Sequence, residues 1–165
     1  MDARWTDRPI HDAEKTLFGV IGVSYDISDL KATQDALRGR ERQLADAQRL
    51  AHVGTLERNH RTGQEVWTDE IYRIFELDPS VTPNLDRLLK FVHPDDRERV
   101  MNGRRLARET GKSFEDIARI IVPSGLKYIK GTGQVLVDAS GAQERLLMAV
   151  QDITAQKQTE SEIAL

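Results

Sequence analysis

The histidine side chains are the first candidates for chemistry, because the chain contains four of them and no cysteine. His93 precedes the run Pro94–Asp96, and a proline keeps the residue before it out of the helical conformation. This setting predicts that His93 has a loop and capping role and does not hold a metal ion or haem. The other histidines have polar or turn neighbours and no second ligand at metal spacing: His11, His52 and His60. We therefore expect no metal site.

A carboxylate in an otherwise apolar pattern is the second candidate. Strict alternation in a strand places Asp116 on one face with Phe114, Ala118 and Ile120. The two large apolar neighbours indicate that this face is the inner one, where a carboxylate must be paired or hydrogen-bonded. The small side chain of Ala118 would leave space beside it. The pattern predicts a pocket for a small polar ligand near Asp116.

The same strand permits a second orientation of Asp116. If the strand register differs by one residue, the carboxylate turns toward solvent, beside Arg119 or Lys130. No pocket would then form around it. The sequence leaves both interpretations open.

Aromatic residues supply the remaining candidates for a binding site. Trp67, Tyr72 and Phe75 could stack on a planar cofactor, although aromatic residues at helical spacing are more often part of a core. The complete set of predicted pocket residues is Trp67, Tyr72, Phe75, Asp116, Ala118 and Tyr128. No specific cofactor follows from this set, and an unidentified small ligand is the only ligand we predict.

Several classes of function are excluded by composition and motifs. Without cysteine, neither a cysteine nucleophile nor a flavin that reacts through a cysteine adduct is available. The glycines of Gly131–Gly133 lie within an expected strand, so they do not form a phosphate loop, and no kinase core motif is present. A histidine suited to haem is also missing from residues 84–91. We therefore expect no catalytic activity from this segment.

Charge and hydropathy predict the surroundings of the chain. A net charge of −3 argues against nucleic-acid binding. No apolar run approaches the roughly 18 residues that would span a bilayer. We expect a cytoplasmic segment without membrane contact, which leaves room for a membrane anchor elsewhere in a longer parent protein.

The first quarter of the chain predicts a hairpin and a long helix. Residues 3–10 and 17–26 form the hairpin, and residues 29–50 form the helix. In that helix Leu30, Leu37, Leu44, Ala47 and Leu50 make a thin apolar stripe suited to a short coiled coil. We predict a homodimer formed through this helix and the hairpin. The alternative is that the stripe packs on the chain's own sheet.

The remaining elements alternate in a pattern typical of an α+β domain. Expected strands cover 53–59, 64–68, 113–122, 126–138 and 143–152, and expected helices cover 69–76, 84–91 and 95–109. Short connections within each group of strands predict an antiparallel sheet with the helices to one side. Thr68 is the expected cap of the first helix, and Asp95 with Glu98 resembles a capping box for the third.

An internal repeat links the two ends of the chain. Asp26-Ile27-Ser28 recurs as Asp152-Ile153-Thr154, and the same register pairs Asp12 with Asp138, Ala13 with Ala139, Lys31 with Lys157 and Thr33 with Thr159. Each copy is an apolar strand that feeds a polar helix. Ser28 and Thr154 are expected N-caps of these helices. The junction either transmits strain from sheet to helix or only starts the helix.

A family resemblance accounts for this order of motifs. They are Gly54–Thr55, Trp67–Phe75, His93–Arg97, Phe114–Glu115, Pro123–Gly125, Lys130–Gly133, and Asp152–Thr154 with Lys157. Residues 51–157 thereby resemble a PAS domain with its C-terminal PAC motif, of the subgroup common in sensor histidine kinases. The resemblance implies a five-stranded antiparallel sheet with short helices on one face around a potential ligand pocket, flanked by N- and C-terminal signalling helices. Asp116, Ala118 and Tyr128 depart from the family pattern, which argues against transferring a relative's ligand.

The predicted organisation has four parts. Residues 1–28 are the C-terminal hairpin of a preceding PAS domain, 29–50 a coiled-coil linker, 51–155 the PAS domain and 156–165 the start of an output helix. We predict a sensory and dimerisation module of a bacterial histidine kinase, which passes ligand or partner binding through Asp152–Thr154 to an output domain in the same chain. The alternatives are a ligand-free dimerisation spacer and a PAS module of a diguanylate cyclase or another regulator.

Overall fold

The computed structural model describes residues 3–11 and 17–164, and the side chains of residues 26–164. The chain divides into two compact units, Met1–Asp46 and Ala47–Leu165. In the first unit, strand β1 (Ala3–His11) pairs antiparallel with β2 (Leu17–Asp26), which confirms the predicted hairpin. Helix α1 (Ser28–Leu50) follows and begins one residue before the predicted start.

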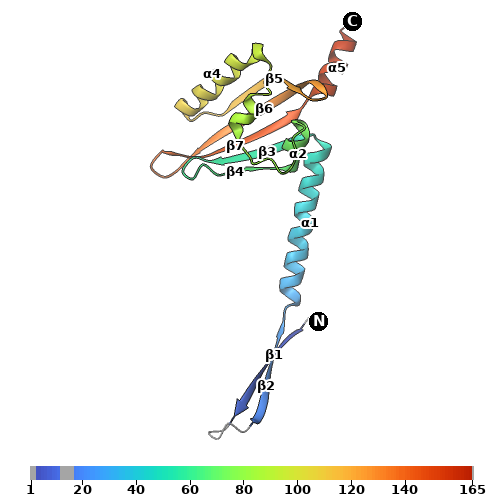
Figure 1. Ribbon diagram of the computed structural model, residues 1–165, viewed down its shortest axis with the longest axis vertical. Helices are drawn as coiled ribbons and strands as arrows, with labels where there is room; N and C mark the ends of the chain where they lie inside the picture. Colours follow the sequence, from blue (N-terminus) through green and yellow to red (C-terminus); the bar gives the residue numbers. More distant parts are fainter. Residues whose placement is uncertain (1–2, 12–16, 165) are drawn as a thin grey trace. The chain divides into compact units, whose positions relative to one another are not determined.

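The second unit contains a five-stranded antiparallel sheet (Figure 1). Its strands are β3 (Val53–Asn59), β4 (Glu65–Trp67), β5 (Phe114–Val122), β6 (Gly125–Val137) and β7 (Gln143–Asp152), in the spatial order β4-β3-β7-β6-β5. Its helices are α2 (Asp69–Ile74), α3 (Leu85–Leu89), α4 (Pro94–Thr110) and α5 (Thr154–Ile163). The predicted α+β class and all five strands of this sheet are confirmed. Because β7 pairs with β3 on one side and β6 on the other, the last strand lies at the centre of the sheet.

The core lies between the helices and one face of the sheet. Alternate residues of β5 are buried on this face, with Ile120 fully enclosed and Val122 nearly so. Val150 of β7 is also fully enclosed and belongs to the same core cluster as Ile71 and Ile74 of α2. Burying an aliphatic side chain of this size stabilises the fold by about 1.5–3 kcal/mol. The predicted apolar stripe of α2, which ends in Phe75, is therefore the part of this helix that faces the sheet.

Two predicted helix caps need correction. The N-cap of α4 is His93, whose Nδ1 accepts a hydrogen bond from the Asp95 amide at 3.2 Å, and Pro94 is the first helical residue. The capping role predicted for His93 is confirmed, and the capping box assigned to Asp95 is wrong by two residues. Thr68 does stand at the N-cap of α2, but its hydroxyl bonds the backbone of Thr55 in β3 and makes no cap bond. Thr68 thus fastens α2 to the sheet.

The two repeated junctions have the same hydrogen bonds. Asp26 Oδ1 accepts from the Ser28 amide at 2.9 Å and from its hydroxyl at 2.6 Å. Asp152 Oδ1 accepts from the Thr154 amide at 3.0 Å and from its hydroxyl at 2.5 Å. The prediction that Ser28 and Thr154 are N-caps is wrong, because each is the first helical residue and the aspartate two residues earlier supplies the accepting oxygen. The aspartate of each copy therefore supplies the side-chain acceptor at the start of the helix.

Helix α1 buries none of its side chains. In the predicted stripe, Leu30, Leu37 and Leu44 are 56%, 58% and 61% exposed. None of the helices in residues 3–11 and 17–164 combines the length and apolar content needed to cross a bilayer.

Candidate functional site

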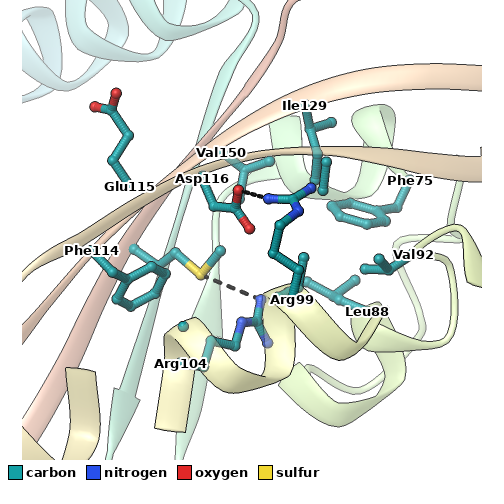
Figure 2. Close-up of a pocket in the computed structure, with 15 residues that line it drawn as sticks. Phe75, Leu88, Val92, Arg99, Arg104, Phe114, Glu115, Asp116, Ile129 and Val150 are labelled. Atoms are coloured by element: carbon teal, nitrogen blue, oxygen red, sulfur yellow. Dashed lines mark hydrogen bonds and ion pairs between the residues drawn. The ribbon is translucent and has the colours of Figure 1, made fainter. Parts of the chain in front are cut away.

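A cavity of about 260 Å³ lies between α4 and the inner face of the sheet (Figure 2). Its walls are mostly apolar and come from both the helices and the strands: Phe75, Leu88, Val92, Phe114, Ile129 and Val150. Four charged residues also line it: Arg99, Arg104, Glu115 and Asp116. An apolar space with a few polar groups that converge on it is the usual form of a small-molecule site.

The orientation of Asp116 is settled by an ion pair with α4. The carboxylate faces inward and accepts a hydrogen bond from Arg99 Nη1, while Arg99 Nη2 donates to the Ile117 carbonyl at 2.8 Å. The predicted inner position of Asp116, beside a cavity, is confirmed. The alternative, in which Asp116 turns to solvent beside Arg119 or Lys130, is wrong. The partner comes from α4 because this helix crosses the same face of the sheet.

Small residues keep the cavity open. Ala118 is buried on the cavity wall, and Gly103 of α4 presents no side chain toward it. A β-carbon at Gly131 would lie 3.2 Å from the methyl carbon of Met148. At Gly133 it would lie 2.2 Å from the Phe114 ring, so any side chain there would displace that ring. Phe114 can form part of the wall only because residue 133 is a glycine.

A second carboxylate ties the start of α4 to β5. Buried Asp96 accepts three hydrogen bonds from Arg119, from the backbone amide at 2.9 Å, from Nε at 3.0 Å and from Nη2 at 2.7 Å. The Arg119 side-chain bonds are the main reason that the pKa of Asp96 lies far below its ordinary value. The Arg119 amide and the charges of Arg119 and Arg99 lower it further, and burial opposes them. This pair fixes the helix that carries Arg99 and Arg104.

The aromatic candidates separate in the structure. Phe75 lines the cavity, whereas Trp67 and Tyr72 pack against each other with ring centroids 5.4 Å apart and do not line it. The Tyr72 hydroxyl donates to the Val81 carbonyl at 3.1 Å. The buried Trp67 Nε1 has no hydrogen-bond partner among the described residues. Of the predicted pocket residues, the fold brings Phe75, Asp116 and Ala118 together at one cavity.

Tyr128 and the predicted relay residues meet at the end of the sheet. The Tyr128 amide donates to Thr154 Oγ1 at 3.0 Å, and its carbonyl accepts from the Ile153 amide at 2.9 Å. The Asp152 amide donates to the His52 carbonyl at 2.9 Å. The start of α5 is thereby bonded to β6 and to the residue before β3. Tyr128 therefore belongs to this junction and not to the cavity.

Sequence reasoning missed the two arginines of the cavity. Arg99 and Arg104 lie on α4 beside its buried residues Val100 and Ala107. The spacing of those two apolar residues indicates the face of α4 that packs on the sheet. This spacing was the sequence signal from which the two arginines could have been predicted near the cavity. For metals, the described part of the chain holds no group of three or more histidine, aspartate or glutamate side chains placed to share an ion.

Comparisons with known proteins agree with this geometry. Residues 64–150 match the family model described as PAS fold. Two curated relatives match most of the chain: Probable diguanylate cyclase DgcE of Escherichia coli, 25% identical over 133 residues, and Blue-light-activated histidine kinase of Brucella anthropi, 32% identical over 124 residues. These matches cover 81% and 74% of this chain. They cover only 12% and 25% of the relatives, so the chain corresponds to a small part of each.

Solved structures show the same fold. A sensory box histidine kinase/response regulator from Burkholderia thailandensis superposes with a TM-score of 0.59 at 25% identity, covering 74% of this chain and 91% of that one. The N-terminal domain of a diguanylate cyclase with PAS/PAC sensor from Marinobacter aquaeolei has a TM-score of 0.58 at 21% identity, covering 64% and 98%. The chain therefore belongs to the PAS fold family, as a sensory module related to the PAS domains of histidine kinases and diguanylate cyclases.

Proposed function

We propose that the chain is a dimeric, non-catalytic sensory module of a longer cytoplasmic or membrane-anchored signalling protein. Its cavity binds a small ligand, and α5 passes the state of the cavity to an output domain in the same chain. The relation to a histidine kinase at 32% identity favours a histidine kinase as the parent. A diguanylate cyclase parent is the second candidate because of the 25% identical relative.

The observation that carries this proposal is that two strands serve both the cavity and the exit helix. In β7, Val150 lines the cavity, and two residues later Asp152 accepts two hydrogen bonds from Thr154, the first residue of α5. In β6, Ile129 lines the cavity and the adjacent Tyr128 bonds Ile153 and Thr154. A ligand that favours one packing of the inner face would bias how α5 leaves the sheet.

Asp152→Ala in the full-length signalling protein is expected to change its output. The substitution removes the oxygen that accepts both hydrogen bonds from Thr154 and so loosens the start of α5. Loss of a helix cap costs about 1 kcal/mol, which corresponds to an approximately five-fold shift in a two-state equilibrium. The measurement is the autophosphorylation or cyclase rate of the parent, with and without stimulus.

Asp138→Ala is the matched control for this substitution. Asp138 Oδ1 also accepts an amide and a hydroxyl two residues later, from Ser140, but it does so in the turn between β6 and β7. No helix leaves the sheet at that turn, so output should stay at the wild-type level. Wild-type output from Asp152→Ala under every stimulus, or an equal change from both variants, would refute the relay.

Dimerisation through α1 is the second part of the proposal. Leu30, Leu37 and Leu44 recur every seven residues and are each more than half exposed, which fits the seam of a two-stranded coiled coil. Leu37→Glu with Leu44→Glu is expected to convert the dimer into a monomer, because two like charges would face each other across the seam. Ala32→Glu with Ala45→Glu adds the same charge away from the stripe and should leave the dimer intact. Sedimentation equilibrium at several concentrations measures both, and a wild-type monomer would contradict the proposal.

A ligand-free dimerisation spacer is the competing function. Native mass spectrometry of freshly purified protein separates the two, because a sensor that retains its ligand shows additional mass. The cavity described above favours the sensory function, since a spacer gains nothing from leaving apolar side chains incompletely packed.

A further inference from the structure

Arg104 is a half-buried cation that forms no ion pair among residues 26–164. Its Nη2 lies 3.8 Å from the sulfur of Met148, a weak acceptor, and its Nη1 is fully buried with no hydrogen-bond partner among the described residues. No carboxylate of residues 26–164 forms an ion pair with it. Most buried polar groups in proteins are hydrogen-bonded, so an unpaired guanidinium nitrogen at a cavity wall requires an explanation.

The position of Arg104 lowers the stability of the free protein. Burial lowers the pKa of this guanidinium because desolvation disfavours the charged form, and the more distant charges of Asp86 and Asp116 oppose that effect. An arginine stays protonated in proteins, so the charge is retained at a cost in folding free energy. A carboxylate bound to this guanidinium would reduce this cost.

The other charged residues of the cavity do not satisfy Arg104. Arg99 and Asp116 are paired with each other, so their charges cancel. Glu115 points away from the cavity (Figure 2) and pairs with Lys130 at 3.1 Å. The cavity therefore carries one uncompensated positive charge, that of Arg104.

The remainder of the cavity fits an apolar body. Phe75, Leu88, Val92 and Ile129 form the wall on the far side from Phe114 (Figure 2). The volume of about 260 Å³ exceeds the roughly 150 Å³ of an apolar cavity that accepts benzene. A ligand can therefore be somewhat larger than a single aromatic ring. One free cation and an apolar space match a single negative charge better than the dianion of a phosphate ester.

We infer that this cavity binds a small monocarboxylate with an apolar body, whose carboxylate accepts a hydrogen bond from the guanidinium of Arg104. The aryl or alkyl body lies between α3 and the inner face of the sheet. This inference rests on the proposed sensory function in one respect: it treats the bound molecule as the signal that the module senses. Arg104 is its specificity-determining residue, since it alone distinguishes the carboxylate from a neutral molecule of the same shape.

A neighbouring depression is the competing location for an anion. It has a volume of about 460 Å³ and is lined by Arg58, His60, Arg105 and Arg108 as well as Arg104. Arg105 and Arg108 are exposed, so water already solvates their charges and an ion pair there would gain little. Arg105 does not line the inner cavity, which makes it the matched control for Arg104.

The experiment is an isothermal titration of the 165-residue chain with four probes. Octanoate and 3-phenylpropanoate are the carboxylates, and octanamide and 3-phenylpropanamide are their neutral counterparts. At least one carboxylate should bind about ten-fold or more tightly than its amide, as expected for a charge-assisted hydrogen bond in a desolvated site. Arg104→Met should abolish this preference, and Arg105→Met should leave it unchanged.

Thermal unfolding shows whether the variant is folded. Arg104→Met should be at least as stable as the wild type, because it replaces an unpaired buried cation with an apolar side chain of similar length. Equal binding of carboxylates and amides, no binding of either carboxylate, or an equal loss in Arg105→Met would each overturn the inference. Tight binding of the amides alone would leave ligand sensing intact and exclude the anion. Failure of the relay would appear separately, in the output of Asp152→Ala.

Discussion

Asp96→Asn is expected to lower the free energy of unfolding by about 2–3 kcal/mol at pH 7, the range for hydrogen bonds to a charged group. Asp96 is buried and accepts three hydrogen bonds from Arg119. An asparagine keeps the shape but loses the charge, and its amide nitrogen would face the donors of Arg119. Urea unfolding followed by circular dichroism measures the change.

The effect of Asp96→Asn should depend on pH. Because the folded-state pKa of Asp96 is depressed, its contribution is fully present above the ordinary value of 3.8 and is lost as the pH falls toward the folded-state value. The difference between wild type and variant should therefore be constant from pH 7 to 5 and shrink below about pH 4.

Asp95→Asn is the control for this pair. The Asp95 side chain is 75% exposed and lies 4.0 Å from Arg119, so its removal should change stability by less than about 0.5 kcal/mol. Equal losses of unfolding free energy in Asp96→Asn and Asp95→Asn would contradict the prediction that Arg119 stabilises the fold mainly through Asp96. A loss in Asp96→Asn that persists unchanged at pH 3 would contradict the ionic origin of the stabilisation.

Gly54→Ala is expected to destabilise the chain by about 1–3 kcal/mol, the usual cost of overpacking a filled core. A β-carbon at residue 54 would lie 2.8 Å from the Ile71 backbone nitrogen and 2.8 Å from its Cδ1 atom. The side chain can rotate, but the backbone nitrogen belongs to the first turn of α2. The helix would have to move away from β3, and urea unfolding measures the cost.

Gly103→Ala is the matched substitution with the opposite expected sign. A β-carbon there meets nothing within 4 Å, and the residue lies inside α4. Replacing a helical glycine with alanine should raise stability by up to about 1 kcal/mol. A neutral Gly54→Ala would mean that α2 is not held against β3 as closely as these distances indicate.

Local patterns predicted the elements well but not all of their ends. The alternation that includes Phe114 and Ile120 correctly identified the inner face of β5, and the leucine spacing in α1 correctly identified a helix. The caps were less reliable, because serine, threonine and aspartate all accept hydrogen bonds from free amides. In Asp152-Ile153-Thr154 the aspartate does so, and the threonine hydroxyl instead accepts from Tyr128 of β6.

The candidate site was predictable only in part. The alternation of inward and outward residues in β5 predicted that Asp116 lies beside a cavity. No residue near Asp116 in the sequence indicated that Arg99 is its ion-pair partner. The sequence offered no reason to select Arg104 either, because a lone arginine on a charged helix is normally exposed to solvent. Trp67 and Tyr72 were predicted as pocket residues because aromatic side chains occur both in cores and in ligand sites. In the structure they pack against each other and do not line the cavity.

The sequence by itself determined the class of fold, the order of the strands and helices, and the repeat that starts helices α1 and α5, because these depend on side-chain periods and on groups a few residues apart. The tertiary structure decided which charges are paired and which is left alone. Asp116 meets Arg99 and Asp96 meets Arg119 because α4 crosses β5 and β6. The same crossing leaves Arg104 without a carboxylate partner. The cost of burying a charge depends on neighbouring groups, and only the folded chain brings those neighbours together.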